Sequence, residues 1–475
     1  MNHLLKCNVS DMRNDLNKGK YTSYDLVKFY LSRIIALDKS GPSLNSVLEI
    51  NPDAIYIAQA MDRERSLGKE RSYLHGIPIL IKDNINTHDK MHTSAGSLAL
   101  ADNLATYDAT IIKKLRQAGL VILGKVNMTE MANFMAYNMK NGYSSRGGQV
   151  VNPYNPQGDT WGSSSGSAVA MAANLATLSI GTETDGSIIW PSNNNSVVGL
   201  KPSRGLVSRH GIIPICTAQD IAGPITRNVT DAAYLLNVLV GEDEHDPSTW
   251  CQQGHIPSNY ADYLTMDGVK GKRVGFNIGY QNEYTEDQRA LSDKAREVFI
   301  KEGAELIECN LPHQRSDHNV LLYEMKPCLN AYLSTTSYSN QCRSLKEIID
   351  FNRSFPDQCL KYGQGLLEDA EALSGTLTEQ EYIETRYKAL EGAGPDGIMK
   401  IMDDYQLDYI ISPGISDTSP ISGYPSITVP LGYDRENMPF GLTFISKMYD
   451  EPTLIKAAFT FEQITHFQKL PPFDL

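Results

Sequence analysis

Residues 161–191 read WGSSSGSAVAMAANLATLSIGTETDGSIIWP, and this stretch decides the fold. It holds two small clusters of serine and glycine, at 162–167 and 185–187, separated by the uncharged, alanine-rich residues 168–176. Small apolar residues favour a helix that its neighbours approach closely, so we predict a buried helix there. Residues 177–182 then predict a short strand that ends at the second cluster. The two clusters therefore supply the best candidate nucleophiles in the chain.

A second informative stretch is the apolar run from His75 to Ile81, which ends in Lys82-Asp83-Asn84. An unpaired lysine is costly to bury. Adjacent side chains on a strand point to opposite faces, so Lys82 and Asp83 do not easily pair with each other. We therefore predict a functional role for Lys82, with a plain ion pair to Asp83 as the alternative.

Four motifs in this order resemble the amidase signature family: GIPILIKDN at 76–84, GSSSGS at 162–167, GTETDGSI at 181–188 and VVGLKPS at 197–203. The resemblance runs from about Thr22 to Glu462, which is nearly the whole chain. Within the family, RGGQ at 146–149 and LVSRHGIIPI at 206–215 look most like the peptide C-terminal amidases.

The resemblance implies an α/β fold, in which a mixed central β-sheet is covered by helices on both faces of a single amidase signature domain, residues 1–475. Its expected parts are a helical N-terminal part (about 1–70), the signature core (about 71–240) and a variable helical substrate region (about 311–400). The residue pattern agrees, because helices predicted at 108–118 and 129–135 flank a strand predicted at 121–124. A further amphipathic helix is predicted after Thr22, which is its expected N-cap, with Asp25 placed to favour the positive end of the helix.

By resemblance, Ser187 is the nucleophile, Ser163 is the serine that relays its proton, and Lys82 is the base. A lysine with its usual pKa is protonated at neutral pH, so Lys82 acts as a base only if burial and donated hydrogen bonds favour the neutral amine. The resemblance also implies a cis peptide bond between Gly162 and Ser163, and it requires no metal ion and no cofactor. The oxyanion is expected to be held by the backbone N–H groups of Thr184, Asp185, Gly186 and Ser187.

The serine clusters have other interpretations. Residues 162–166 fit G-x-S-x-G, the nucleophile elbow of α/β-hydrolases, which would make Ser164 the nucleophile. That elbow needs a preceding strand, and residues 152–158, NPYNPQG, make a poor one. A phosphate-binding loop would end in Lys-Ser/Thr, which is absent here. Tight packing of small side chains would explain the glycines but not the combination with Lys82.

The substrate is expected to be a neutral linear amide. Trp190 stands where other branches of the family carry an arginine that would recognise a carboxylate. The resemblance therefore favours the C-terminal carboxamide of a peptide or amino acid derivative, with Asn133 and Trp190 as expected substrate contacts. The alternatives are an amidotransferase A-type subunit of a glutamine-dependent complex, and a fatty acid or aryl acyl amide hydrolase.

Composition limits the remaining choices. With 475 residues and 41% hydrophobic residues the chain can bury a sizeable core, and its formal net charge of −13 argues against a nucleic-acid partner. Seven cysteines without a CxxC pair predict reduced thiols. The N-terminus resembles no signal peptide, and no run reaches the roughly 18 apolar residues of a membrane span. We expect a cytoplasmic monomer or homodimer that acts on a small-molecule or peptide amide.

Overall fold

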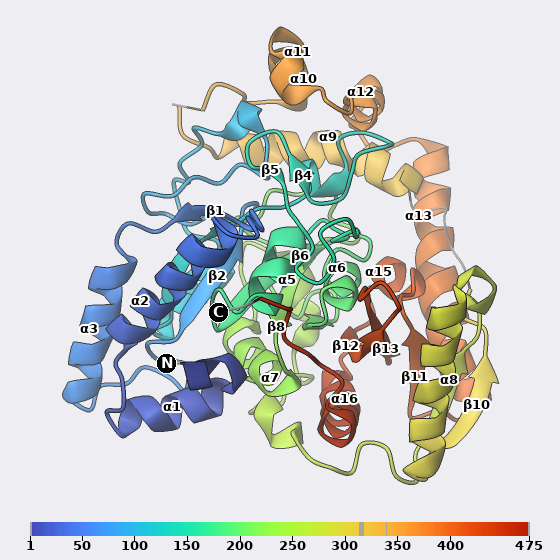
Figure 1. Ribbon diagram of the computed structural model, residues 1–475. Helices are drawn as coiled ribbons and strands as arrows, with labels where there is room; N and C mark the ends of the chain where they lie inside the picture. Colours follow the sequence, from blue (N-terminus) through green and yellow to red (C-terminus); the bar gives the residue numbers. More distant parts are fainter. Residues whose placement is uncertain (1, 313–317, 339, 474–475) are drawn as a thin grey trace.

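The computed structural model describes residues 2–312, 318–338 and 340–473, and an 11-stranded mixed β-sheet runs through it (Figure 1). This sheet, with helices packed around it, confirms the predicted fold class. In spatial order its strands are β1 (Val47–Ile50), β3 (Val121–Val126), β2 (Pro78–Lys82), β6 (Leu178–Glu183), β8 (Ile221–Thr226), β7 (Val198–Lys201), β12 (Ser426–Tyr433), β13 (Pro439–Ile445), β11 (Tyr409–Pro413), β9 (Arg273–Asn277) and β10 (Glu305–Cys309).

The central strands β3, β2 and β6 place the site. β2 pairs in parallel with both β3 and β6, and Ile81 lies opposite Ile180 of β6. Parallel strands end at the same edge of a sheet, so the end of β2 at Lys82 meets the end of β6 at Glu183. All residues of these three strands are buried, as expected for strands covered on both faces.

The helix predicted after the first serine cluster is α5 (Ser165–Ala172), and each of its residues is buried. It begins three residues earlier than predicted and ends before Asn174, which adopts a left-handed backbone (φ 58°). At the second cluster, α6 (Ile189–Asn194) begins two residues after Ser187. The first serine cluster therefore runs into α5, the second immediately precedes α6, and β6 lies between the two helices in the chain.

Three helices near the N-terminus cover one end of the sheet: α1 (Val9–Asn17), α2 (Ser23–Arg33) and α3 (Ala54–Ser66) (Figure 1). The predicted cap of α2 is confirmed, because the Thr22 side chain accepts a hydrogen bond from Asp25 N–H and the Asp25 carboxylate accepts one from Thr22 N–H. Further helices around the sheet are α4 (Thr110–Gln117), α7 (Val229–Leu239), α8 (Glu286–Lys301) and α16 (Glu451–Thr465).

The helix predicted at 129–135 is wrong. The structure has a short 3-10 turn, Glu130–Asn133, in which Met131, Ala132 and Asn133 all have left-handed backbones (φ 49°, 55° and 69°). Met131 N–H donates to Ala95 O (2.9 Å), outside the segment, so a contact with another loop replaces the helical hydrogen bond. The residues were apolar enough for a helix, but tertiary contacts decided the backbone.

The predicted helical region at 311–400 contains α9 (His318–Ser334), α10 (Leu345–Ser354), α11 (Pro356–Cys359), α12 (Gly365–Ala372) and α13 (Gln380–Ala393), with residues 313–317 and 339 outside the described residues. α9 to α12 lie at the top of the molecule in Figure 1. α9, α10 and α12 form an apolar cluster with Met128, Phe134 and Met135. This region therefore packs directly on the loop that borders the second serine cluster.

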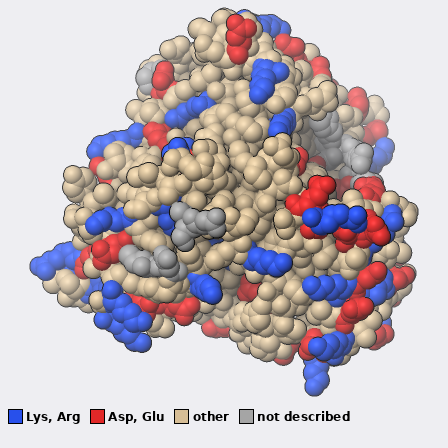
Figure 2. Space-filling view, in the orientation of Figure 1, with Lys and Arg blue, Asp and Glu red and all other residues tan. Residues whose placement is uncertain are grey.

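Charged side chains of both signs are interspersed over the face shown in Figure 2, around a broad uncharged centre. Among the described residues, no helix combines the length and the apolar character needed to cross a membrane.

Candidate active site

Lys82 is the last residue of β2, and its side chain is fully buried. Its Nζ donates hydrogen bonds to Ser163 Oγ (2.8 Å), Ser164 Oγ (2.8 Å) and Thr182 O (3.0 Å). Burial lowers the pKa of Lys82 well below its usual value, although Glu183 and Asp220 oppose that shift by favouring the cation. The amine therefore lies against two hydroxyl groups in an environment that favours its neutral form.

The first serine cluster presents two hydroxyls to Lys82. The Gly162–Ser163 peptide bond is cis, as expected, and Ser163 O accepts a hydrogen bond from Thr129 N–H (3.0 Å). Ser164 Oγ donates to Thr182 O (2.9 Å) and accepts from Thr182 N–H (3.2 Å), so it bridges α5 and β6. Both serine side chains are fully buried. The contacts of Ser164 are those of a residue that anchors the strand.

Ser187 lies beside this cluster, since Ser164 N–H donates to Ser187 O (3.3 Å). Its side chain is almost buried, and it lines a cavity of about 290 Å³. Gly186 has a left-handed backbone (φ 77°), and a Cβ at this position would lie 2.2 Å from the Trp190 ring. A side chain at Gly186 would thus displace the tryptophan, so glycine is required at the turn that presents Ser187.

Two carboxylates, the buried Glu183 and the half-buried Asp220, hold the loop 184–187 in place. Glu183 accepts hydrogen bonds from Ile188 N–H (2.8 Å) and Ile189 N–H (3.0 Å). Thr184 Oγ1 donates to Asp220 Oδ1 (2.5 Å). The other oxygen of Asp220 accepts from the N–H groups of Ile215 (2.8 Å) and Cys216 (3.0 Å). Burial raises the pKa of Asp220 to about 6 and also raises that of Glu183.

On the opposite face of the sheet, near the ends of β2 and β3, the charged side chains have different partners. The Asp83 carboxylate accepts hydrogen bonds from Gly96 N–H (2.9 Å) and from the Ser94 hydroxyl, and it forms an ion pair with Arg146 (3.3 Å). Lys125 of β3 is also fully buried and donates to Ile85 O (2.6 Å) and Thr93 Oγ1 (3.0 Å). Lys82 and Asp83 therefore have separate partners, as the alternation along a strand predicted.

Asn133 and Trp190, the two expected substrate contacts, line the cavity that contains Ser187. Asn133 is exposed, whereas Trp190 is half-buried and packs edge-on against Trp161 (ring centroids 4.8 Å apart, interplanar angle 86°). Trp190 therefore packs against Trp161 and also forms part of the cavity wall. Phe134, Ala136, Tyr137 and Met139 also line this cavity and give it an aromatic and apolar wall.

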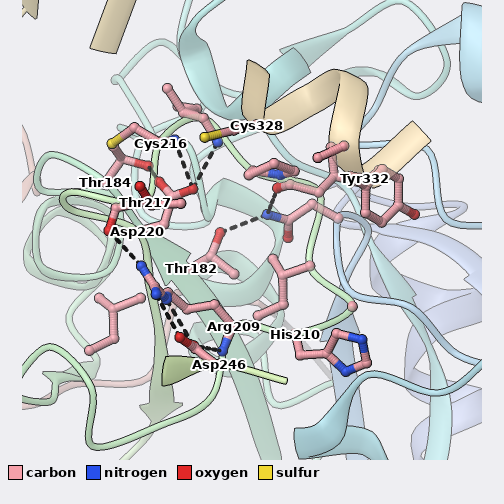
Figure 3. Close-up of a pocket in the computed structure, with 18 of the residues that line it drawn as sticks. Thr182, Thr184, Arg209, His210, Cys216, Thr217, Asp220, Asp246, Cys328 and Tyr332 are labelled. Atoms are coloured by element: carbon pink, nitrogen blue, oxygen red, sulfur yellow. Dashed lines mark hydrogen bonds and ion pairs between the residues drawn. The ribbon is translucent and has the colours of Figure 1, made fainter. Parts of the chain in front are cut away.

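A second cavity, of about 500 Å³, adjoins the first along Ala132, Thr184 and Ile215. Figure 3 shows it beneath α9, with Cys328 and Tyr332 on one side and Thr182 and Thr184 on the other. Arg209 closes its lower part and pairs with Asp246 through two hydrogen bonds (2.6 and 2.9 Å). Thr184 of the loop 184–187 therefore borders both cavities.

The sequence did not indicate the residues that support Lys82 and the loop 184–187 through hydrogen bonds. Asp220, Glu183 and Thr182 all support Lys82 or the loop 184–187, yet none was singled out. Glu183 and Thr182 lie inside a quoted motif, so their position alone could have indicated them. Asp220 lies 36 residues from Thr184, and only the antiparallel pairing of β6 and β8 brings it close.

Comparisons with known proteins agree with this geometry. A family model described as Amidase matches residues 25–421. The native peptide amidase from Stenotrophomonas maltophilia superposes with a TM-score of 0.95 at 42% sequence identity, covering 98% of this chain and 99% of that chain. A probable amidase from Arabidopsis thaliana is 40% identical over 481 residues, 98% of this chain and 91% of that protein.

The glutamyl-tRNA(Gln) amidotransferase A subunit of Geobacter metallireducens is also similar, at 31% identity over 497 residues that cover 98% of this chain and 99% of that protein. The family match spans most of the chain, and the relatives at 40% and 42% identity are amidases. This chain therefore belongs to the amidase signature family and is an amidase, a hydrolase of carbon–nitrogen bonds in linear amides.

Proposed function

We propose that the chain hydrolyses the C-terminal carboxamide of a peptide or amino acid derivative to the free acid and ammonia, with Ser187 as nucleophile, Ser163 as relay and Lys82 as base. The observation that carries the proposal is the 2.8 Å contact between Lys82 Nζ and Ser163 Oγ in a fully buried site. Burial supplies what a lysine base needs, because it lowers the pKa of Lys82.

In the first half-reaction the neutral Lys82 amine takes the proton of Ser163, which takes the proton of Ser187. Ser187 Oγ then attacks the amide carbon, and the carbonyl oxygen becomes an oxyanion held by the backbone N–H groups of Thr184 to Ser187. The carbon–nitrogen bond breaks as the proton returns from Lys82 through Ser163 to the leaving nitrogen. Ammonia departs and leaves an acyl ester on Ser187.

In the second half-reaction water replaces Ser187 as the nucleophile. It loses its proton through Ser163 to Lys82 and attacks the ester, and the returning proton releases Ser187 and the carboxylic acid. Protons and electrons balance over the two half-reactions, and water is the only co-reactant. The chain's own residues supply each proton transfer.

The lining of the Ser187 cavity supports a neutral amide over a carboxylate-bearing one. Of the described residues that line it, Asp185 is the one that carries a charge, and the others are apolar or uncharged. A substrate carboxylate would lose its hydration there and gain no cation. The 42% identity to a peptide amidase supports a peptide amide in particular.

The test is to purify the chain alone and to measure ammonia release from an acetylated dipeptide amide, a long-chain fatty amide and malonamate. We expect the highest kcat/KM for the peptide amide, and each tenfold difference corresponds to about 1.4 kcal/mol in transition-state binding. Preference for the fatty amide would leave the mechanism and change the substrate.

The similarity to an amidotransferase A subunit supports one other candidate, a protein that works only within a glutamine-dependent complex. The same experiment separates the two functions. An isolated chain that hydrolyses no simple amide, but releases ammonia from glutamine when the other proteins of such a complex are added, would establish that alternative.

A further inference from the structure

The cavity around Ser187 continues into a larger groove on one side. The groove has a volume of about 750 Å³, and it shares Trp161, Asp185 and Trp190 with the Ser187 cavity. The smaller cavity has apolar walls suited to one side chain, whereas the groove is large enough for a further part of a substrate. An acyl chain bound at Ser187 can therefore extend past the Trp161–Trp190 pair.

Four carboxylates line this groove: Asp185, Glu283, Asp417 and Asp434. Among the described residues that line it there is no lysine, arginine or histidine. Glu283 is exposed, and the other three are half-buried. Aromatic side chains complete the walls, with Tyr284 and Phe440 packed edge to face (ring centroids 5.7 Å apart, interplanar angle 80°). Aromatic faces and carboxylates both attract organic cations.

Arg435, which follows the groove residue Asp434 in the sequence, binds carboxylates outside the groove lining. Arg435 follows Asp434 directly, but its guanidinium binds Asp287 (2.7 and 2.8 Å) and Glu286 (3.1 Å), which are not part of the groove lining. In Figure 2 charged side chains of both signs gather near the beginning of α8. The guanidinium of Arg435 is therefore paired with carboxylates outside the groove lining.

The arrangement suits an organic cation better than a metal ion. Within the described residues, no three His, Cys, Asp or Glu side chains converge closely enough to hold a metal. The two turn hydrogen bonds that Asp434 accepts, from Glu436 N–H (2.9 Å) and Met438 N–H (2.8 Å), both reach Oδ1. The carboxylates line the groove without three of them converging on one point, so they can attract an extended organic cation rather than hold a metal ion.

We propose that this groove binds the part of a peptide amide that precedes the amide-bearing residue, and that it selects a cationic group there, either a lysine or arginine side chain or a free α-amino group. The inference rests on the proposed function, because it assigns the acyl side of the same substrate. The amide-bearing residue itself occupies the Ser187 cavity, where Asp185, at the border with the groove, is the one charged residue among the described lining. The substrate is therefore neutral at its amide end and positive upstream.

The experiment compares acetylated tripeptide amides that differ only in one residue, which is lysine, glutamine or glutamate, placed at each of the two positions before the C-terminal amide residue. We expect kcat/KM to fall from lysine to glutamine to glutamate, by roughly tenfold overall at the more sensitive position, because each partly exposed pair contributes little alone. High salt should reduce the ratio.

Two substitutions tie the effect to the groove. Glu283→Gln and Asp434→Asn together remove two charges, and the amide oxygen of the new asparagine can still accept the turn hydrogen bonds. They should reduce the lysine-to-glutamate ratio to about a third of its wild-type value. The matched control is Glu297→Gln, an exposed residue of α8 outside the groove lining, which should leave the ratio unchanged.

Equal kcat/KM for all three peptides, or a ratio that the double variant does not change, would overturn this inference and leave the proposed function intact. If none of the peptide amides were hydrolysed, the proposed function would fail and this inference with it. A preference for glutamate would contradict the charge argument directly.

Discussion

The ends of β2 and β3 place two fully buried lysines at one edge of the sheet but on opposite faces. Lys125 lies opposite Ile81 in the parallel register, so it points away from the face that Lys82 occupies. Burial lowers the pKa of both amines, to about 8 for Lys125 and well below the usual value for Lys82. Burial alone therefore does not distinguish a catalytic lysine from a structural one.

The partners make the difference. Lys125 donates to a backbone carbonyl and a threonine hydroxyl, and Asp83 is the foremost of the nearby carboxylates that favour its cation. Two of the three acceptors of Lys82 are serine hydroxyls, which can also donate a proton to a neutral amine. Lys125 thus contacts one hydroxyl, that of Thr93, whereas Lys82 lies against two serine hydroxyls, one of which is the proposed relay.

The largest expected effect is that of replacing Ser187, on the Lys82 side of the comparison. Ser187→Ala removes the proposed nucleophile and should reduce kcat by roughly 10⁴-fold or more, because no other group can form the acyl ester. The melting temperature should stay close to that of the wild type. If the variant kept most of its activity while Ser164→Ala lost it, the α/β-hydrolase interpretation would replace ours.

Substitution of each lysine in turn should distinguish the role of Lys82 in catalysis from the role of Lys125 in stability. Lys82→Met should lower kcat/KM by roughly 10²–10⁴-fold with little loss of stability, because Ser164 still satisfies Thr182 O. Lys125→Met should cost about 1–3 kcal/mol of unfolding free energy, since Ile85 O loses the shorter of its hydrogen bonds (2.6 Å from Lys125 Nζ, against 3.4 Å from Thr93 Oγ1), and should leave kcat of the folded enzyme within a few fold.

Kinetics and denaturant titration of both variants measure these two effects. Loss of turnover in Lys125→Met without loss of stability would contradict the assignment of the two faces.

The two serines that contact Lys82 at the same distance provide a finer comparison. Ser163→Ala should reduce kcat by roughly 10²–10³-fold, because the proton path between Ser187 and Lys82 is broken. Ser164→Ala removes an anchor to β6 and should cost about tenfold or less in kcat, together with some stability. Equal losses in the two variants would mean that Ser163 has no special role as relay.

The smallest expected effect is a shift in pH dependence. In the proposed mechanism the neutral amine of Lys82 is the active form, so kcat/KM should rise with pH as the ammonium loses its proton. The Asp220 carboxylate raises the pKa of Lys82, and Asp220→Asn should therefore move the acid limb of the profile to lower pH. The pH profiles of both enzymes measure this shift. A limb that moves to higher pH would contradict the stated electrostatic role.

Local sequence predicts part of this site. The alternation after Ile81 separated Lys82 from Asp83, and the small residues around α5 indicated a buried helix that neighbours approach closely. The cis bond and the proposed triad came from the resemblance, not from periodicity or composition.

What could not be predicted depends on contacts between distant segments. The turn Glu130–Asn133 looked helical in sequence, but Met131 N–H bonds to Ala95 O and the backbone turns left-handed. Asp220 reaches Thr184 only because β8 pairs with β6. The acidic groove joins residues between Trp161 and Phe440, and no local pattern indicates that they meet.

The most direct test of the central claim is to locate the acyl ester. The enzyme is acid-quenched during turnover of a peptide amide, digested, and mapped by mass spectrometry. We predict one adduct, with the mass of the substrate minus ammonia, on Ser187, and its absence in Ser187→Ala and strong reduction in Lys82→Met. An adduct on Ser164 or Ser163 in the wild-type enzyme would contradict the account.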